Sequence, residues 1–179
     1  MWAAAIALVV STLLGIGDDV AVGEDPAAGA DYAEVRTSGG LRIGARIEAV
    51  GADLDLALLW IGDAAGTASA PVGHLDTGER LSLAGYPYGR PYTVSVGPVT
   101  ARHRFDEEGM RADTAFVDAA VDVGNSGGAA FDSENRVAGI VFAREQRTGL
   151  AAVIDGDTVT RFLDGGERHG DPTACEAEG

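Results

Sequence analysis

The residues with the clearest chemical potential lie at 124–128, where Ser126 stands inside the run Gly-Asn-Ser-Gly-Gly. Glycine adopts backbone conformations that other residues avoid, so such a run can turn sharply and expose the serine hydroxyl. Backbone amides at a sharp turn can converge on one point and stabilise a developing oxyanion. A glycine-rich hairpin with an incidental serine fits the same five residues, because short motifs also match by chance. The run alone therefore leaves open whether this serine performs acyl transfer.

A second candidate is Asp55, which precedes the apolar run at 56–59. A carboxylate at the head of a buried strand is costly unless a hydrogen-bond donor meets it. Asp55 could orient a catalytic imidazole, or it could simply cap a turn through its own backbone. The spacing does not choose between these two roles.

A general base is harder to find, because the chain has only three histidines: His74, His103 and His169. All three are expected on the surface, and none precedes Asp55. His74, in the stretch between two sets of predicted strands, is the one that could reach a cleft. The three are scattered and lack the spacing of a metal site, so we expect neither a metal ion nor another cofactor.

Short apolar segments broken by Gly, Asp and Pro predict an all-β protein. We expect an N-terminal lobe over 1–61, a linker over 62–78, a second lobe over 79–164 and a disordered tail over 165–179. Asp157 is expected to cap a short helix at 158–163. The expected strands are 9–12, 32–37, 41–50, 54–61, 80–86, 92–105, 115–121, 129–131, 137–143 and 149–154.

Charge excludes some partners. The formal net charge is −15, and all 13 basic residues are arginine. Nucleic acids and anionic membrane surfaces attract clustered positive charge, so neither is an expected partner. The uncharged apolar run at 2–16 is short for a membrane span. It is either a buried strand or a signal or anchor segment, and only an anchor would bring the chain to a membrane.

Several segments together resemble the trypsin-like serine proteases, in particular the bacterial HtrA-like and membrane-associated branch. The segments occur in family order over residues 32–164: 85–87, 92–99, 118–128, 137–142 and 148–151. The resemblance implies two Greek-key barrels of the six-stranded type and a short C-terminal helix. The N-terminal barrel is expected to be incomplete.

The same resemblance assigns roles to residues. It implies that Ser126 is the nucleophile, that Asp55 is the triad acid, and that the amides of Gly124 and Ser126 form the oxyanion hole. The family's histidine position falls on Leu14. Two functions therefore stay open: a serine endopeptidase, or an inactive relative that binds peptides or acts as a scaffold.

The resemblance also implies a substrate pocket walled by Ala120, Ala143, Arg144 and Ala151. Small apolar walls favour a small or medium aliphatic side chain. The implied partner is a polypeptide, and the oligomeric state is not indicated. The family implies the cell envelope or the extracellular space, whereas a strand at 1–16 would fit the cytoplasm.

Overall fold

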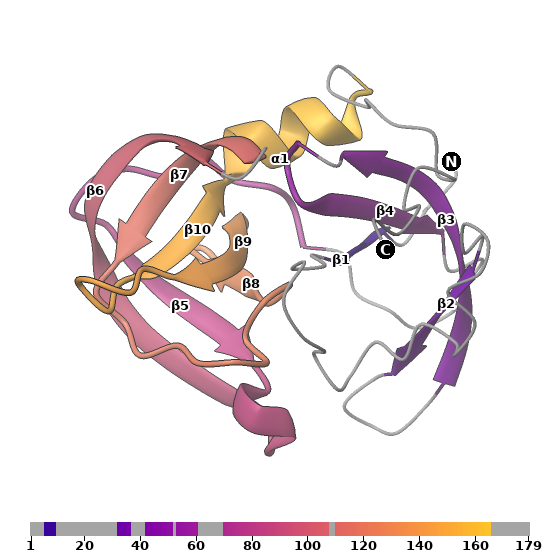
Figure 1. The fold of residues 1–179 in the computed structure, drawn as a ribbon, viewed down its shortest axis with the longest axis horizontal. Helices are drawn as coiled ribbons and strands as arrows, with labels where there is room; N and C mark the ends of the chain where they lie inside the picture. The colour runs from indigo at the N-terminus through magenta and orange to yellow at the C-terminus, as the bar shows by residue number, and fades with distance from the viewer. Residues whose placement is uncertain are drawn as a thin grey trace.

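A four-stranded antiparallel sheet and a closed six-stranded barrel lie side by side, and one helix runs across the top of both (Figure 1). They are seen in a computed structural model, which describes residues 6–9, 32–36, 42–51, 53–60, 70–107 and 110–165. The chain completes the sheet first and then the barrel.

The N-terminal sheet has the strand order β1-β4-β3-β2. Its strands are β1 (Ile6–Val9), β2 (Tyr32–Arg36), β3 (Arg42–Gly51) and β4 (Leu56–Trp60). In β4, Leu56, Leu58 and Leu59 are buried, whereas Trp60 at the end of the strand is exposed. A tight turn, with Leu54 N–H donating to the Gly51 carbonyl at 2.9 Å, connects β3 to β4 and carries Asp55.

The barrel closes in the order β10-β7-β6-β5-β8-β9. Each of its strands therefore pairs with a neighbour on both sides over at least part of its length. Its interior is filled by small and medium aliphatic side chains, among them Leu81, Leu83 and Val153. The strands are β5 (Arg80–Gly85), β6 (Thr93–Glu107), β7 (Met110–Val117), β8 (Ala129–Phe131), β9 (Val137–Arg144) and β10 (Ala151–Asp155).

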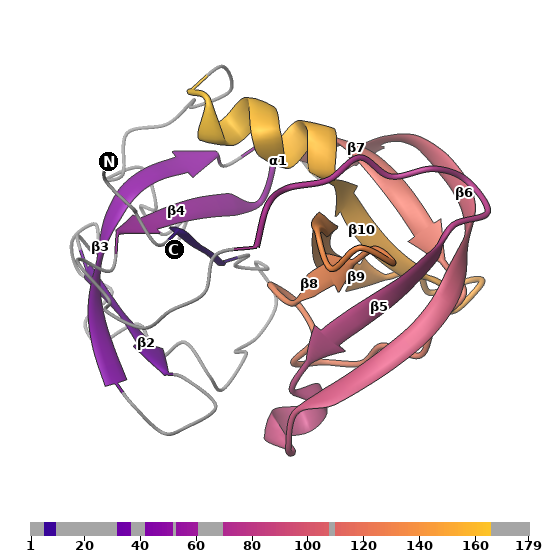
Figure 2. The ribbon, with the colours of Figure 1, turned by 180° about the vertical axis from the view of Figure 1, so that it is seen from behind.

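The helix α1 (Gly156–Leu163) lies over the junction of sheet and barrel, as the reverse view also shows (Figure 2). Its buried Val159 and Phe162 belong to a hydrophobic core that also contains Leu56 from the sheet and Phe142 from the barrel. An added Cβ at Gly51 would lie 3.0 Å from the Phe162 ring, so the β3–β4 turn approaches the helix closely. This shared core fixes the turn that carries Asp55 against the barrel.

The predicted fold class is confirmed, because the described chain is β-rich with one short helix and one barrel is closed. Most predicted strands are present, with ends that shift by a few residues. The strand predicted at 115–121 is instead Met110–Val117, because β7 pairs with β6 back to the hairpin at Glu107 and Met110. After Val117 the chain leaves the barrel. The strand predicted at 9–12 lies at Ile6–Val9, and residues 10–12 are outside the described residues.

The predicted helix cap is also wrong, by two residues. Asp155, not Asp157, caps α1, and its carboxylate accepts from the Asp157 amide at 3.0 Å. The last residue of β10 therefore also serves as the N-cap of α1. Strand and helix patterns that are considered separately do not predict such a shared residue.

Among the described residues no helix is long and apolar enough to cross a membrane. The tail at 166–179 lies outside those residues.

Candidate active site around Ser126

Ser126 lies in the connection between β7 and β8, directly after a tight turn at 122–125. The Asn125 amide donates to the Asp122 carbonyl at 3.0 Å, which closes the turn. Gly124, the third residue, has a φ of +96°, whereas Val123 is not among the residues with positive φ. This combination defines a type II turn, in which the third position favours glycine.

Neighbouring backbone groups fix the orientation of the peptide between Val123 and Gly124. The Tyr88 amide, in the short 3-10 turn Pro87–Gly89, donates to the Val123 carbonyl at 2.6 Å. In a planar trans peptide the carbonyl and the N–H point in opposite directions. The Gly124 N–H is therefore directed away from Tyr88. A Cβ at Gly124 would lie 2.4 Å from the Tyr86 carbonyl oxygen, so the packing requires glycine as well.

The rest of the loop is held by hydrogen bonds that do not use the amides of Gly124 and Ser126. Buried Asn125 accepts from the Asp122 amide at 3.0 Å through its side-chain oxygen, and the Gly127 amide donates to the Val141 carbonyl at 2.8 Å. Among the described residues, neither the Gly124 amide nor the Ser126 amide donates to a protein acceptor. These two N–H groups are therefore available to an oxygen atom of a ligand.

The Ser126 hydroxyl donates to the Phe142 carbonyl at 3.1 Å, and the serine is half-buried. A carbonyl oxygen cannot take up the hydroxyl proton, so this contact does not activate the serine. A catalytic base would have to replace Phe142 as the acceptor of that hydrogen bond.

Neither histidine of the described residues makes that contact. The His74 ring approaches two carboxylates, with Nδ1 2.9 Å from Asp157 and Nε2 3.6 Å from Asp76. His103 stacks on Phe116, with ring centroids 4.3 Å apart. Both rings are therefore engaged away from the serine hydroxyl. Leu14 and His169 lie outside the described residues.

Asp55 is half-buried in the β3–β4 turn, with a φ of +54° that Asp tolerates better than most residues. Burial raises the pKa of its carboxyl from 3.8 to about 7. Within the described part of the chain, no hydrogen bond or ion pair reaches this carboxylate. Its neighbours Leu54 and Leu56 share one hydrophobic core with Phe142, the residue whose carbonyl holds Ser126. One hydrophobic core therefore supports both residues, Asp55 through its neighbours in the N-terminal sheet and Ser126 through Phe142 of the barrel.

The four residues predicted to wall a pocket have different environments. Ala120 and Arg144 are exposed, and Ala143 is half-buried. Ala151 is fully buried in the barrel core, so its side chain offers no surface to a ligand. Sequence reasoning missed Tyr88, whose amide contacts Val123 from 35 positions earlier in the chain. Val123 belongs to the loop at 118–128 that carries the predicted nucleophile, here called the nucleophile loop. In the sequence, residues 85–87, which precede Tyr88, indicate only a segment that resembles the family.

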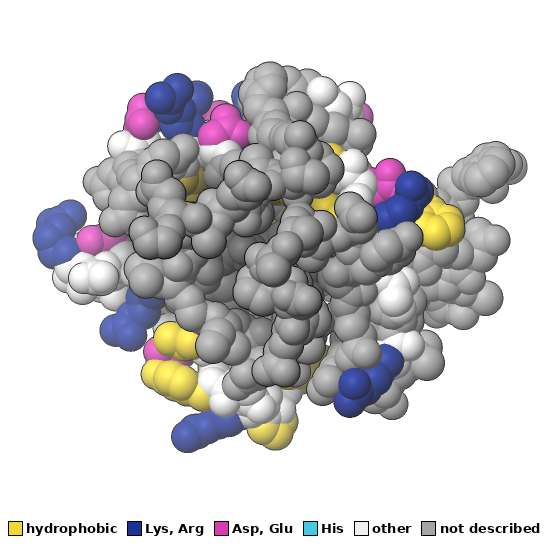
Figure 3. Space-filling view, turned by 45° about the vertical axis from the view of Figure 1, so that its right-hand side comes forward, with side chains coloured by type: hydrophobic (Ala, Val, Ile, Leu, Met, Phe, Trp, Pro, Cys, Tyr) yellow, Lys and Arg dark blue, Asp and Glu magenta, His cyan; other side chains and the backbone are white. Residues whose placement is uncertain are grey.

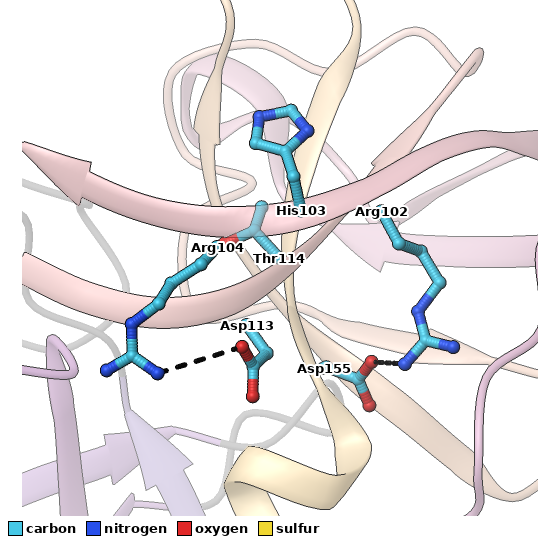
Figure 4. Close-up of a pocket in the computed structure, with 6 residues that line it drawn as sticks. All are labelled: Arg102, His103, Arg104, Asp113, Thr114 and Asp155. Carbon is cyan, nitrogen blue, oxygen red and sulfur yellow. Dashed lines mark hydrogen bonds and ion pairs between the residues drawn. The ribbon is translucent and has the colours of Figure 1, made fainter.

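A separate hollow on the outer side of the barrel contains charged groups that are already paired (Figure 4). Arg102 reaches the buried Asp155 carboxylate, and Arg104 lies 4.0 Å from Asp113. His103 points away from both pairs in the close-up. Within the described residues, no cluster of three or more His, Cys, Asp or Glu side chains could hold a metal ion.

Comparison with known proteins identifies the family of this chain. Residues 11–140 match the family model described as the trypsin-like peptidase domain. A probable periplasmic serine endoprotease DegP-like of Brucella suis is 37% identical over 91 residues, which cover 49% of this chain and 18% of the relative. A serine protease Do-like HtrA of Lactobacillus helveticus is 32% identical over 120 residues, 63% of this chain and 29% of the relative. The chain thus spans less than a third of these curated relatives.

The solved structure of the HtrA-type protease AlgW with a decapeptide superposes with a TM-score of 0.67 at 26% identity. The superposition covers 77% of this chain and 46% of that protein. The family model covers most of the chain, and the barrel and the relatives agree with it. The chain belongs to the trypsin-like peptidase domain family, and its similarity is to the HtrA branch of serine proteases.

Proposed function

We propose that this domain binds extended peptides beside Ser126 and does not cleave them at the rate of a working protease. One observation carries the proposal: the Ser126 hydroxyl donates to the Phe142 carbonyl, while His74 and His103 are engaged elsewhere. A serine without a base is a weak nucleophile at neutral pH. A triad that lacks one member retains only about 10³–10⁴-fold catalysis over water.

An open strand edge supports peptide binding. The β9 residue Val141 exchanges backbone hydrogen bonds with Gly127 and Gly128, and Phe142 accepts from Ser126. Beyond that point the nucleophile loop no longer pairs with β9. The Glu145 amide donates toward β10, to the Leu150 carbonyl at 2.9 Å, so the backbone groups of Arg144 face the opposite, unpaired side. An extended peptide can add as a strand to such an edge.

The two free amides give this edge an anchor point. We assign the oxyanion hole to Gly124 N–H and Ser126 N–H, because the type II turn directs the first away from Tyr88 and no described protein acceptor takes either. A peptide carbonyl oxygen would accept from both. Ala120 and Ala143 beside it favour a small or medium aliphatic side chain, and we withdraw Ala151 from that wall because it is fully buried.

The same geometry favours a second candidate, a serine endopeptidase with Ser126 as nucleophile and Asp55 as acid. Its specific support is the pair of free amides at Gly124 and Ser126, because stabilisation of a developing oxyanion is usually the largest single contribution to catalysis of this kind. Such an enzyme needs a base that neither described histidine supplies. For either function we propose the cell envelope as the location, since the Brucella relative is named as periplasmic.

The deciding experiment measures binding and cleavage on one set of samples. Fluorescent peptides with small aliphatic residues are titrated with the wild-type protein, Ser126→Ala and Ser133→Ala, and the mixtures are then separated by chromatography. Ser133, exposed in the β8–β9 turn, is the matched control. We expect all three proteins to bind the peptides saturably. Their dissociation constants should agree within about twofold, because the hydroxyl that Ser126→Ala removes contacts Phe142. We expect no cleavage above the Ser126→Ala background. Cleavage that only Ser126→Ala abolishes would instead establish the endopeptidase. No binding at all would refute the peptide-binding proposal.

A further inference from the structure

A small cluster of charged and aromatic side chains lies at the rim of the proposed peptide edge. We call it the rim cluster: Tyr88, Arg90, Asp122 and Arg144. It joins three segments that are distant in the sequence, namely the β5–β6 connection, the nucleophile loop and the end of β9. Each segment also borders Ser126 or the turn that presents the Gly124 amide.

Contacts within the rim cluster are close but weak. The Arg144 guanidinium lies 3.9 Å from the Asp122 carboxylate, and the two side chains are 56% and 38% exposed. The Arg90 guanidinium lies 5.8 Å from the centre of the Tyr88 ring. Interaction with the Asp122 carboxylate raises the pKa of the Tyr88 hydroxyl, while Arg144 and Arg90 act in the opposite direction. All four groups therefore share one electrostatic environment.

Arg144 has unused capacity to bind an anion. A guanidinium carries five N–H donors, and a separation of 3.9 Å from Asp122 is beyond hydrogen-bond distance. An exposed ion pair of this kind contributes little, so a ligand carboxylate can compete for Arg144 at low cost. Two arginines against one aspartate leave the rim cluster with a positive balance.

That balance contrasts with the rest of the chain, whose formal net charge is −15. On the face drawn in Figure 3, blue arginine side chains lie next to magenta acidic ones at several points. The rim cluster therefore places two arginines and one aspartate beside the proposed edge of an acidic protein. Positive potential at a cleft raises the local concentration of acidic ligands.

Position along the strand indicates which part of a peptide Arg144 would meet. Phe142 holds the Ser126 hydroxyl, and Arg144 is two residues further along β9. Strand residues rise about 3.3 Å each, so a peptide paired with this edge places one residue near Ser126 and another, two positions away, opposite Arg144. Side chains two positions apart in a strand point to the same face.

We propose that Arg144, within the rim cluster, makes the edge selective for peptides that carry an acidic side chain two positions from a small aliphatic residue held at Ser126. The inference rests on the peptide-binding function proposed above and names its ligand class. The acidic residue accepts hydrogen bonds from the Arg144 guanidinium, and the aliphatic residue lies at Ser126 on the same face of the peptide. Asp122 keeps Arg144 beside the edge when no peptide is bound.

The test compares peptides that differ only at the acidic position, with Asp, Asn or Lys there. Amidated C-termini remove the other source of a carboxylate, and a free-acid version of the Asn peptide measures its effect separately. Binding is followed by fluorescence anisotropy at low and at high salt. The variants are Arg144→Gln and Arg144→Glu. Arg147→Gln is the matched control. The substitution removes the same charge, and Arg147 is 87% exposed on the adjacent β9–β10 turn.

We expect the wild-type protein to bind the Asp peptide about fivefold more tightly than the Asn peptide at low salt, with the difference shrinking as salt is added. Arg144→Gln should abolish the preference, Arg144→Glu should shift it to the Lys peptide, and Arg147→Gln should retain it. Equal binding of the Asp and Asn peptides, a preference that survives in Arg144→Gln, or a preference only for the free C-terminus would overturn the inference. In those cases the neutral peptide still binds, so the peptide-binding function stands. Failure of every peptide to bind refutes both.

Discussion

Asp55 provides a test that separates the two proposed functions through stability. Its carboxyl is half-buried, and desolvation raises its pKa from 3.8 to about 7. Below about pH 4 the group is neutral in the folded and unfolded states, so it has no pH-dependent effect on folding. Between pH 4 and 7 the unfolded chain ionises while the folded chain stays protonated, and the folded state loses stability as the pH rises. The loss is complete above about pH 7.

The size of this effect follows from the pKa difference. One pKa unit corresponds to about 1.4 kcal/mol, so the full shift would amount to about 4 kcal/mol. Because solvent reaches the carboxyl, we expect about 1–2 kcal/mol instead. Asp55→Asn should therefore raise the free energy of unfolding by that amount at pH 8 and leave it unchanged at pH 3.5.

Urea denaturation at several pH values measures this difference. For a domain of this size the midpoint should rise by roughly 0.5–1 M urea at pH 8. Asp106→Asn is the control, since Asp106 is 68% exposed on the β6–β7 hairpin. A variant Asp55→Asn that is less stable than the wild type at pH 8 would refute the reasoning. It would show that the folded protein uses the negative charge of Asp55, as the acid of a working triad does.

Three further substitutions have defined outcomes. Gly124→Ala should weaken peptide binding and lower the stability by about 1–3 kcal/mol, because its Cβ would lie 2.4 Å from the Tyr86 carbonyl at a φ of +96°; titration and melting check this, and unchanged binding would exclude this amide from the site. Leu14→His should increase peptide hydrolysis if residue 14 holds the family's histidine position; no increase in a folded variant would contradict the alignment there. Asp132→Ala should cost about 3 kcal/mol at pH 7, because it leaves Arg136 and two backbone amides without their buried acceptor; a change below 1 kcal/mol in urea denaturation would show that the ion pair contributes little.

Local chemistry explains what could be predicted from the sequence. Gly124 and its neighbours indicated a sharp turn because few residues adopt a φ of +96°, and the turn is present. The β-strands followed from apolar runs broken by glycine and aspartate. The helix cap was misplaced because Asp155 and Asp157 are both aspartates that lie close to the start of the predicted helix. Only the bond from the Asp157 amide to the Asp155 carboxylate separates them.

Contacts between distant segments account for what could not be predicted. Tyr88 fixes the Val123 carbonyl through a backbone amide, so its side-chain type carried no signal. Burial of Ala151 depends on the closure of the barrel between β9 and β7, which the local pattern does not specify. The raised pKa of Asp55 similarly results from a core that is shared by the sheet, the barrel and the helix.

The central claim is that Ser126 lies beside two amides proposed to bind an oxygen atom, and that no base among the described residues activates its hydroxyl. Labelling with a fluorophosphonate probe, which reacts with activated serines, tests this claim most directly when an active trypsin-like protease is treated in parallel. We predict that the wild-type protein is labelled no faster than Ser126→Ala, while both still bind the aliphatic peptides. Rapid labelling that disappears in Ser126→Ala would contradict the account and show that a base reaches the hydroxyl in place of the Phe142 carbonyl.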